Sequence, residues 1–466
     1  MERENAWKKY KKTELTKLEK LNKEYIKFLS ENKTERECAA YAVKAAKEAG
    51  YVDLREILKK KKKVHPGDKI FAVNMNKAVV LFNIGKKPLE KGMAILGAHI
   101  DSPRMDIKQN PLYEDTDLAY LDTHYYGGIK KYQWVTTPLA IHGVFAKKDG
   151  TVTEVCIGED KGDPIFCVTD LLIHLSQENM DKKASKVIEG EALDILIGSR
   201  PLASNSKEEK DQKDAVKKNI LAILKQKYDV DEEDFLSAEL EVVPAGAARE
   251  SGIDRSMIMA YGQDDKVCAF TSLKAMLAVE DPTYTTCCLL VDKEEIGSVG
   301  ATGMRSQFFE NTVAELIGCV GSYDDRLVKR CLQNSRMLSS DVSAAFDPTY
   351  ASAYEKKNAA YFGRGMVFNK FTGARGKSGS NDANAEFMAR IRGILDAADV
   401  SYQTAELGKV DVGGGGTIAY IMALYGMEVI DCGVAVLNMH APWEITSKAD
   451  VYETEKGYEV FLKKIF

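Results

Sequence analysis

Short apolar runs alternate with amphipathic helical patterns at both ends of this chain, and this alternation constrains the fold more than any other feature. Before residue 104, strands are expected at KIFAVNM, AVVLFNIG and MAILGAHID. After residue 251, the run Thr285–Val291 (TTCCLLV) is apolar and β-branched enough for a buried strand. Strands that alternate with helices favour an α/β domain built on one central sheet.

The middle of the chain has a different pattern of apolar and charged residues. From about residue 104 to 250, short alternating runs such as PLAIHGVFA and TVTEVCIG are followed by a highly charged stretch at 205–235. The full length of 466 residues also exceeds what one ordinary core accommodates. The sequence therefore predicts an α/β domain interrupted by a β-rich insert.

Composition excludes several classes of protein. A net charge of −5 gives no electrostatic basis for binding nucleic acid, and the run Lys59–Lys63 is expected to end a helix. No stretch reaches the roughly 18 apolar residues of a membrane helix, and the first residues, MERENAWKKYKK, have no apolar signal core. Nine cysteines without CxxC spacing indicate reduced thiols. We expect a cytoplasmic protein that binds neither membranes nor nucleic acid.

Two glycine-containing segments resemble phosphate loops but fail on spacing. The segment Gly373–Ser378 ends like a P-loop, yet Phe371 stands where the first glycine of that motif belongs. The run Gly413–Gly416 fails the dinucleotide-binding pattern, because Ile418 occupies the third glycine position. Nucleotide binding is therefore not the preferred interpretation.

Acidic residues and histidines recur where apolar runs end or a helical pattern begins. With only six histidines in the chain, two of them share this context with six carboxylates: His99, Asp101, Asp264, Asp265, Glu294, Glu295, Asp341 and His440. In an open α/β sheet such strand ends converge on one crevice. Nitrogen and carboxylate donors without a thiolate suit Zn²⁺, Mn²⁺ or Co²⁺ in a catalytic site.

Each of these residues also has an ordinary structural explanation when taken alone. The adjacent pair Glu294 and Glu295 could simply mark a solvated strand end, and a lone histidine is more often a satisfied structural residue than a ligand. The shared context of the whole set makes independent structural explanations much less plausible than one metal site.

The ordered motifs GAHIDSPR, GQDDKVCAF, DKEEIGS, SSDVSAAFDPTY and LNMHAPWE resemble the aspartyl aminopeptidase-type family of dinuclear zinc aminopeptidases. The resemblance extends from about residue 60 to 460, although 205–235 adds nothing to it. Two departures occur, since the family often has HTDSP and DHEE where this chain has HIDSP and DKEE. Neither departure removes an expected ligand.

The resemblance implies a role for each site residue. Two divalent metal ions, zinc in the first place with manganese or cobalt as alternatives, would be bridged by Asp264. His99 and Asp341 would complete one metal site, and Glu295 and His440 the other. Asp101 would orient the His99 imidazole. Glu294 would be the general base that activates the attacking water. The implied activity is hydrolysis of the N-terminal residue from peptides with a free N-terminus.

The resemblance also implies an architecture and an assembly. A zinc-exopeptidase-type central sheet flanked by helices would comprise residues 1–103 and 251–466, and residues 104–250 would form an inserted oligomerisation domain. The family assembles into a tetrahedral dodecamer with internal active sites, so a homo-oligomer is expected. His174, in DLLIHLSQ, matches a histidine that reaches the active site of a neighbouring subunit. The local sequence alone fits a core or surface histidine equally well.

Substrate preference is expected to differ from the family name. Members that prefer acidic residues carry a lysine in a segment similar to VIKVN, whereas the matching stretch here is MVFNK, with Asn369 at the lysine position. In a strand, Lys370 would point to the opposite face, although a local bulge could return it to the pocket. The substitution predicts cleavage of neutral or apolar N-terminal residues at least as well as acidic ones.

Two other classes of function remain. A related dinuclear-metal carboxypeptidase or amide deacylase would share the metal ligands but recognise a carboxylate or acyl group. A non-enzymatic assembly protein would be expected to lack a ligand or the base, and none of these residues is missing from the chain.

Overall fold

The computed structural model describes residues 3–203 and 213–466, and these residues divide into two compact units. The first unit comprises Met1–Ser102, Ala248–Met439 and Glu444–Phe466, and the second comprises Pro103–Ala247 and His440–Trp443. The mixed α/β class predicted from the sequence is confirmed. Among the described residues, none of the helices has the length and apolar character needed to cross a membrane.

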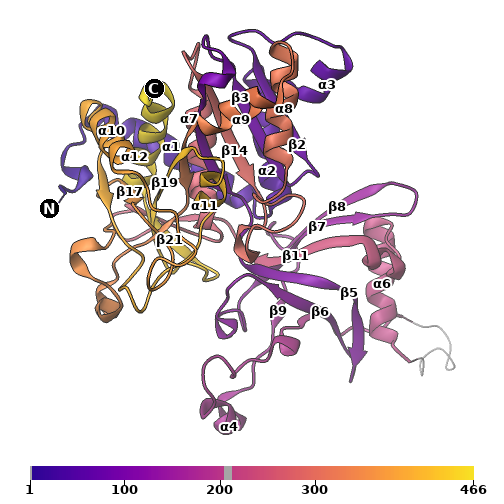
Figure 1. Ribbon diagram of the computed structural model, residues 1–466. Coiled ribbons are helices and arrows are strands. Elements are labelled where there is room, and N and C mark those ends of the chain that lie inside the picture. Colours follow the sequence, from indigo (N-terminus) through magenta and orange to yellow (C-terminus); the bar gives the residue numbers. More distant parts are fainter. Residues whose placement is uncertain (1–2, 204–212) are drawn as a thin grey trace. The chain divides into compact units, whose positions relative to one another are not determined.

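The first unit contains a nine-stranded sheet (Figure 1) with the order β1-β2-β3-β14-β4-β15-β19-β17-β18. Strands β14, β4, β15 and β19 are parallel to one another at its centre. Strands β14 and β4 are buried at every position, and β14 is the buried strand expected at Thr285–Val291. The strands span Val52–Asp53 (β1), Lys69–Asn74 (β2), Ala78–Asn83 (β3), Met93–His99 (β4), Thr285–Val291 (β14), Arg336–Ser340 (β15), Met366–Asn369 (β17), Tyr402–Thr404 (β18) and Glu428–Gly433 (β19).

Helices cover both faces of this sheet because successive strand residues point to opposite sides. Leu96 and Leu290 belong to the apolar cluster that includes α1, α2, α7, α10 and α12, whereas Ile95 and Leu289 belong to the cluster with α3, α8, α9 and α11. These helices span Lys12–Glu31 (α1), Glu35–Glu48 (α2), Leu54–Lys59 (α3), Gln263–Leu277 (α7), Phe308–Val320 (α8), Asp325–Gln333 (α9), Ala385–Ala397 (α10), Ala419–Ala423 (α11) and Lys448–Lys464 (α12).

A smaller five-stranded sheet completes the first unit, in the order β12-β13-β21-β20-β16. Its strands span Arg249–Ser251 (β12), Met257–Ala260 (β13), Ser343–Ala344 (β16), Ala435–Leu437 (β20) and Glu444–Ser447 (β21). Strand β13 directly precedes α7, and β16 directly follows β15. Both belong to one sheet with β20 and β21, which lie near the C-terminus.

The second unit is built on a seven-stranded antiparallel sheet, in the order β8-β7-β11-β5-β6-β10-β9. The strands span Arg104–Asp115 (β5), Leu118–Tyr126 (β6), Leu139–Ala146 (β7), Val152–Ile157 (β8), Cys167–Val168 (β9), Ile195–Gly198 (β10) and Ala238–Pro244 (β11). Helices α4 (Gln177–Met180) and α6 (Ala215–Tyr228) belong to the same segment. Part of the charged stretch at 205–235 lies outside the described residues, and α6 accounts for most of its remainder.

Short 3₁₀ helices occupy several connections. They span Ala6–Lys8 (η1), Leu89–Lys91 (η2), Lys131–Gln133 (η3), Ile173–Leu175 (η4), Gly190–Ala192 (η5), Glu232–Ser237 (η6), Glu294–Ile296 (η7), Pro348–Ala353 (η8) and Lys356–Asn358 (η9). Of these, η7 directly follows the central strand β14 and contains both adjacent glutamates.

Candidate metal centre

His99, the last residue of β4, is the focus of a buried polar cluster in the first unit. Its Nδ1 atom lies 3.0 Å from the backbone oxygen of Asp101 and 3.3 Å from that residue's Oδ1 atom. Its Nε2 atom lies 3.2 Å from Asp264 Oδ1 and 3.9 Å from Asp341 Oδ1. The imidazole is thus surrounded by carboxylates on both of its nitrogen edges.

Strand register explains why His99 and Asp341 converge. Strands β4 and β15 are parallel, with Gly97 opposite Ser339. His99 and Asp341 each come two residues after this pair, so both side chains lie on the same face of the sheet, at the carboxyl ends of β4 and β15. Open α/β sheets place ligands at this edge.

A break in helical geometry at the start of α7 directs Asp264 and Asp265 into the cluster. Asp264 has φ −81° and ψ 106°, outside the helical region. Its backbone N–H donates to Glu444 Oε2 at 3.0 Å, and its carbonyl accepts from Ser102 Oγ at 2.8 Å. Both backbone polar groups of Asp264 are therefore satisfied while its side chain faces His99.

Asp101 links the histidine to the two adjacent glutamates. Its Oδ1 accepts from the backbone N–H of Glu294 at 3.1 Å, and its Oδ2 accepts from that of Glu295 at 3.2 Å. The turn before them is tight, because Lys293 has φ 68°. One buried carboxylate thus contacts the imidazole and fixes the backbone from which both glutamates project.

Two groups of side chains are close enough to hold a metal ion. One is His99, Asp264 and Glu295, and the other is His99, Asp265 and Asp341; within each group the donor atoms all lie within 4.8 Å of one another. Imidazole nitrogen with carboxylate oxygens is a donor set that fits Zn²⁺ in a catalytic site. The structure therefore brings together His99, Asp264, Glu295 and Asp341, and it adds Asp265, which the sequence analysis did not assign as a ligand.

The electrostatics of this cluster favour a bound cation. Burial, and then the neighbouring charge of Asp265, raise the pKa of Asp341 well above its ordinary value. Burial also raises the pKa of Asp265 well above its ordinary value. Burial alone would lower the pKa of His99, but hydrogen bonds to Asp101 and Asp264 outweigh this and raise it well above its ordinary value. Crowded, buried carboxylates with raised pKa values are a setting in which a divalent cation can take the place of bound protons.

Two predicted site residues belong to the second unit. His440 has φ 64°, and its Nδ1 atom lies 2.9 Å from the backbone oxygen of Gly128. It is in neither of the two metal-compatible groups found among the described residues. His174 lies in η4 and is exposed. The metal role of His440 and the intersubunit role of His174 stay predictions.

Sequence reasoning missed two buried residues that support the cluster. Lys266 is fully buried, and its Nζ donates to Ser102 Oγ at 2.6 Å, so that it supports the hydroxyl that binds the Asp264 carbonyl. Glu444 is also buried and accepts the Asp264 N–H. The only available signal was their presence inside the motifs GQDDKVCAF and LNMHAPWE.

The residues of the expected specificity segment lie at the end of β17. Asn369 is 7% exposed, and its Oδ1 lies 3.4 Å from Ser343 Oγ. It pairs with Asp431 of the neighbouring strand β19, and Asp431 pairs on its other side with Ser339 of β15. Lys370 is instead engaged by Asp382, with Nζ 2.6 Å from Oδ1. Asn369 thus belongs to the sheet, whereas Lys370 is held by an ion pair outside it.

Comparisons with known proteins found a matching family and similar chains. Residues 28–462 match the family described as Aminopeptidase I zinc metalloprotease (M18). The chain is 60% identical over 461 residues to a probable M18 family aminopeptidase 1 of Clostridium acetobutylicum, with 99% of this chain and 98% of the relative covered. The crystal structure of an M18 aminopeptidase from Thermotoga maritima superimposes with a TM-score of 0.93 at 44% identity and full coverage of both chains.

A more distant structure shares the fold. The S. cerevisiae mApe1 dodecamer has a TM-score of 0.75 at 19% identity, and the alignment covers 95% of this chain and 96% of the yeast chain. At this level of identity, the likeness concerns the fold alone.

Proposed function

Because the chain belongs to the M18 family of zinc aminopeptidases, we propose that the cluster around His99 is its catalytic centre. The enzyme is a metalloaminopeptidase that hydrolyses the N-terminal residue from peptides. The observation that carries the assignment is the presence of two donor groups that share His99. In each group, residues at the carboxyl ends of parallel strands meet an aspartate from the start of α7. Their donor chemistry fits zinc, with manganese or cobalt as alternatives.

We assign two divalent ions to this centre. Asp264 would bridge them, His99 and Asp341 would complete one site, and Glu295 and His440 the other. The 3.2 Å approach of His99 Nε2 to Asp264 Oδ1 supports a shared ion for these two residues. One donor group also combines both of them with Glu295, which is consistent with Asp264 lying between the ligands of the two ions. Asp265 is buried beside the same ligands and contributes negative charge to the centre.

The adjacent glutamates take different roles in this scheme. Glu295 belongs to a metal-compatible group and Glu294 does not, although Asp101 binds both of their backbone N–H groups. Bound divalent ions supply Lewis acidity, lowering the pKa of water and polarising a carbonyl. Glu294 takes the proton from the attacking water and passes it to the leaving amine. Asp101 holds His99 in the orientation required for ligation.

Asn369 makes the enzyme tolerant of neutral N-terminal residues. An ammonium at this position would attract a carboxylate side chain, whereas an amide offers only neutral hydrogen bonds. The ion pair between Lys370 and Asp382 supports this preference, because it already engages the ammonium group of the residue that follows Asn369. We therefore infer that leucine and methionine are removed at least as fast as aspartate and glutamate.

Assembly into a homo-oligomer, with twelve subunits in tetrahedral symmetry, is part of the proposal. Residues 165–180 of the second unit, here called the arm, carry several large apolar side chains that are largely exposed to solvent: Ile165, Leu171, Leu172, Ile173, Leu175 and Met180. Such a patch is typical of a surface that another chain covers. His174 lies within it, consistent with action in a neighbouring subunit. Free cysteines throughout the described residues suit the reducing cytoplasm.

A comparison of free and blocked substrates tests the assigned reaction. We expect the zinc-loaded enzyme to release the first residue from peptides with a free amine and to leave N-acetylated peptides intact. Preferential release of a C-terminal residue or of an acyl group would instead support the carboxypeptidase or deacylase alternative. Loss of activity with a chelator and its recovery with Zn²⁺, Mn²⁺ or Co²⁺ would rule out the third alternative, a non-enzymatic assembly protein.

A further inference from the structure

The connection between β14 and α8 begins at Asp292 and carries both Glu294 and Glu295. Asp292 is fully buried, with 0% of its surface exposed. Its Oδ1 accepts from the backbone N–H of Lys293 at 2.7 Å, and its Oδ2 accepts from Thr302 Oγ1 at 2.5 Å. The backbone N–H of Asp292 also donates to the carbonyl of Thr302 at 3.2 Å. The two ends of the connection are therefore joined at its base.

The chain between these ends folds tightly on itself. The N–H of Ser298 donates to the Lys293 carbonyl at 2.6 Å, and the Ser298 carbonyl accepts from Arg305 N–H at 3.2 Å. Gly303 allows this closure, since a Cβ atom there would lie 2.4 Å from the Ser298 carbonyl oxygen. Thr302 is therefore held at one position relative to the glutamates.

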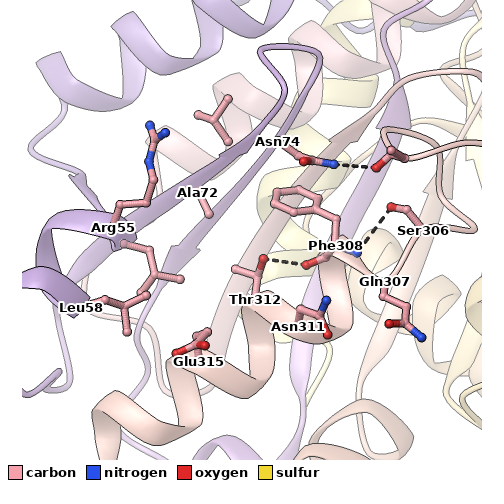
Figure 2. Close-up of a pocket in the computed structure, with 13 residues that line it drawn as sticks. Arg55, Leu58, Ala72, Asn74, Ser306, Gln307, Phe308, Asn311, Thr312 and Glu315 are labelled. Carbon is pink, nitrogen blue, oxygen red and sulfur yellow. Dashed lines mark hydrogen bonds between the residues drawn. The ribbon is translucent and has the colours of Figure 1, made fainter.

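A second side chain anchors the far side of the same connection. Asn74 at the end of β2 donates through Nδ2 to the carbonyl of Ala301 at 2.6 Å (Figure 2). Both residues line a pocket of about 520 Å³ that also includes Phe308 and Thr312. The Asn74 contact fixes Ala301, immediately before Thr302.

Two buried carboxylates thus determine where the glutamates lie. Asp101 binds their backbone N–H groups from the end of β4, and Asp292 closes the base of the connection at the end of the neighbouring strand β14. Asp101 also contacts His99, whereas the hydrogen bonds and the ion pair of Asp292 join it to Lys293 and Thr302 of the connection. Asp292 therefore contacts the backbone of the connection directly, and its charge also acts on Asp101.

We propose that Asp292 and Thr302 are positioning residues for the reaction, which set the placement of Glu294 as base and of Glu295 as ligand. The inference rests on the proposed roles of those two glutamates. Removal of the Thr302 hydroxyl would take away the shortest contact of Asp292 Oδ2 and leave it the Lys293 ammonium at 3.3 Å, and the connection would rearrange to compensate the buried oxygen. Because Glu294 is one residue beyond the Lys293 turn, a small rearrangement would displace its carboxylate from the attacking water.

Thr302→Val tests the proposal against a matched control, Thr312→Val. Both threonines are buried, at 3% and 6% exposure, and each donates a short hydrogen bond; Thr312 Oγ1 donates to the Phe308 carbonyl at 2.6 Å within α8 (Figure 2). We expect Thr302→Val to lower kcat by roughly 10–100-fold with KM changed less than about twofold, the scale seen when residues that orient a metal centre are removed. Thr302→Ser, which retains the hydroxyl, should recover most of kcat, and Thr312→Val should leave it unchanged.

Zinc affinity provides a readout that does not depend on turnover. Titration against a chelator should show zinc binding weakened by about tenfold in Thr302→Val and unchanged in Thr312→Val. If Thr302→Val does not fold, Asp292→Asn replaces it, because the amide preserves the side-chain volume; a kcat loss of at least about tenfold is expected there too.

Outcomes of these experiments separate the inference from the function on which it rests. Equal kinetics and zinc affinity for Thr302→Val and Thr312→Val, or a wild-type Asp292→Asn, would overturn the positioning role while leaving the catalytic centre intact. Full activity of Glu294→Gln would instead refute the assigned base. A kcat loss in Thr302→Val that is not recovered in Thr302→Ser would show that the hydroxyl is not responsible.

Discussion

His99 and His174 lie in very different surroundings. His99 is buried at a strand end, and its two ring nitrogens lie near Asp101, Asp264 and Asp341. His174 lies in the arm between Ile173 and Leu175, whose exposed fractions are 67% and 68%. The metal centre around His99 is organised by contacts within one chain, whereas the arm presents apolar side chains that stay exposed among the described residues.

This difference indicates what each region requires to function. Buried groups that hydrogen-bond to one another are preorganised. Replacing a single donor or acceptor atom among them is therefore expected to change the reaction rate. Exposed apolar groups gain their energy only when a second surface covers them. We therefore expect substitutions in the metal centre to lower the activity of each subunit independently of its neighbours. Substitutions in the arm should lower activity by changing the contacts between subunits.

The largest expected effect is that of Glu294→Gln. The amide cannot accept a proton, so kcat should fall by roughly 10²–10⁴-fold, the usual contribution of a general base. Zinc content should stay at the wild-type level, because Glu294 belongs to neither metal-compatible group. Steady-state kinetics with a leucine substrate measures the loss; a decrease below about tenfold would assign the base to another residue.

A somewhat smaller effect is expected for Glu295→Gln. An amide oxygen is a weaker ligand than a carboxylate, so the affinity for the metal ion held by Glu295 should fall by about 10–100-fold. Activity should return in part when excess Zn²⁺ or Mn²⁺ is added, in contrast to Glu294→Gln. A variant that binds metal normally but is not reactivated would contradict the ligand role.

His174→Ala should lower activity by about tenfold, the scale of one lost hydrogen bond to a charged group. Its metal content should be unchanged. His65→Ala is a matched control, because His65 is also exposed but lies outside the arm. Equal activity of the two variants would show that His174 has no part in the reaction.

Mixed oligomers test whether His174 acts on another subunit. When Glu294→Gln and His174→Ala subunits are dissociated and reassembled together, some centres should combine an intact Glu294 with an intact His174. Activity above that of either parent oligomer is expected. A fully active monomer in sedimentation analysis would contradict the assembly, and with it the function of the arm.

The smallest effect concerns stability rather than turnover. Burial raises the pKa of Asp431 to about 7 in the first unit, although hydrogen bonds from Thr417 and Ser339 favour the ionised form. The ordinary carboxyl of the unfolded chain ionises near pH 4, so between about pH 4 and 7 the folded state binds more protons and loses stability as pH rises.

Asp431→Asn should remove this dependence. In metal-free protein, the variant and the wild type should have similar free energies of unfolding near pH 4. The variant should become relatively more stable up to about pH 7, by at most about 4 kcal/mol. Urea unfolding at several pH values measures the difference, and an identical pH dependence of the two proteins would contradict the buried, protonated carboxyl.

The strands and several helix boundaries could be predicted from local sequence. Thr285–Val291 is a strand as predicted, and Thr34 and Glu37, three residues apart, form a capping box at the start of α2. These features depend on residues a few positions apart, for which periodicity and capping chemistry are sufficient. Strand ends also identified His99 and Asp341, because parallel strands place their carboxyl ends at one edge.

Contacts between distant segments could not be predicted in this way. Asp264 N–H reaches Glu444, which is 180 residues further along the chain, and Ser102 reaches the Asp264 carbonyl from 162 residues away. The choice between Asp264 and Asp265 depends on non-helical backbone angles at the start of α7, which composition does not encode. The hydrogen bond from Thr302 to Asp292 likewise depends on the folded path of the connection between β14 and α8.

Metal analysis of three proteins side by side tests the central claim most directly. Wild type, Glu294→Gln and Glu295→Gln would each be loaded with Zn²⁺, dialysed and analysed for zinc per subunit. We predict two equivalents in the wild type and in Glu294→Gln, and a deficit in Glu295→Gln. A deficit in Glu294→Gln together with full zinc in Glu295→Gln would contradict the division of the two glutamates into base and ligand.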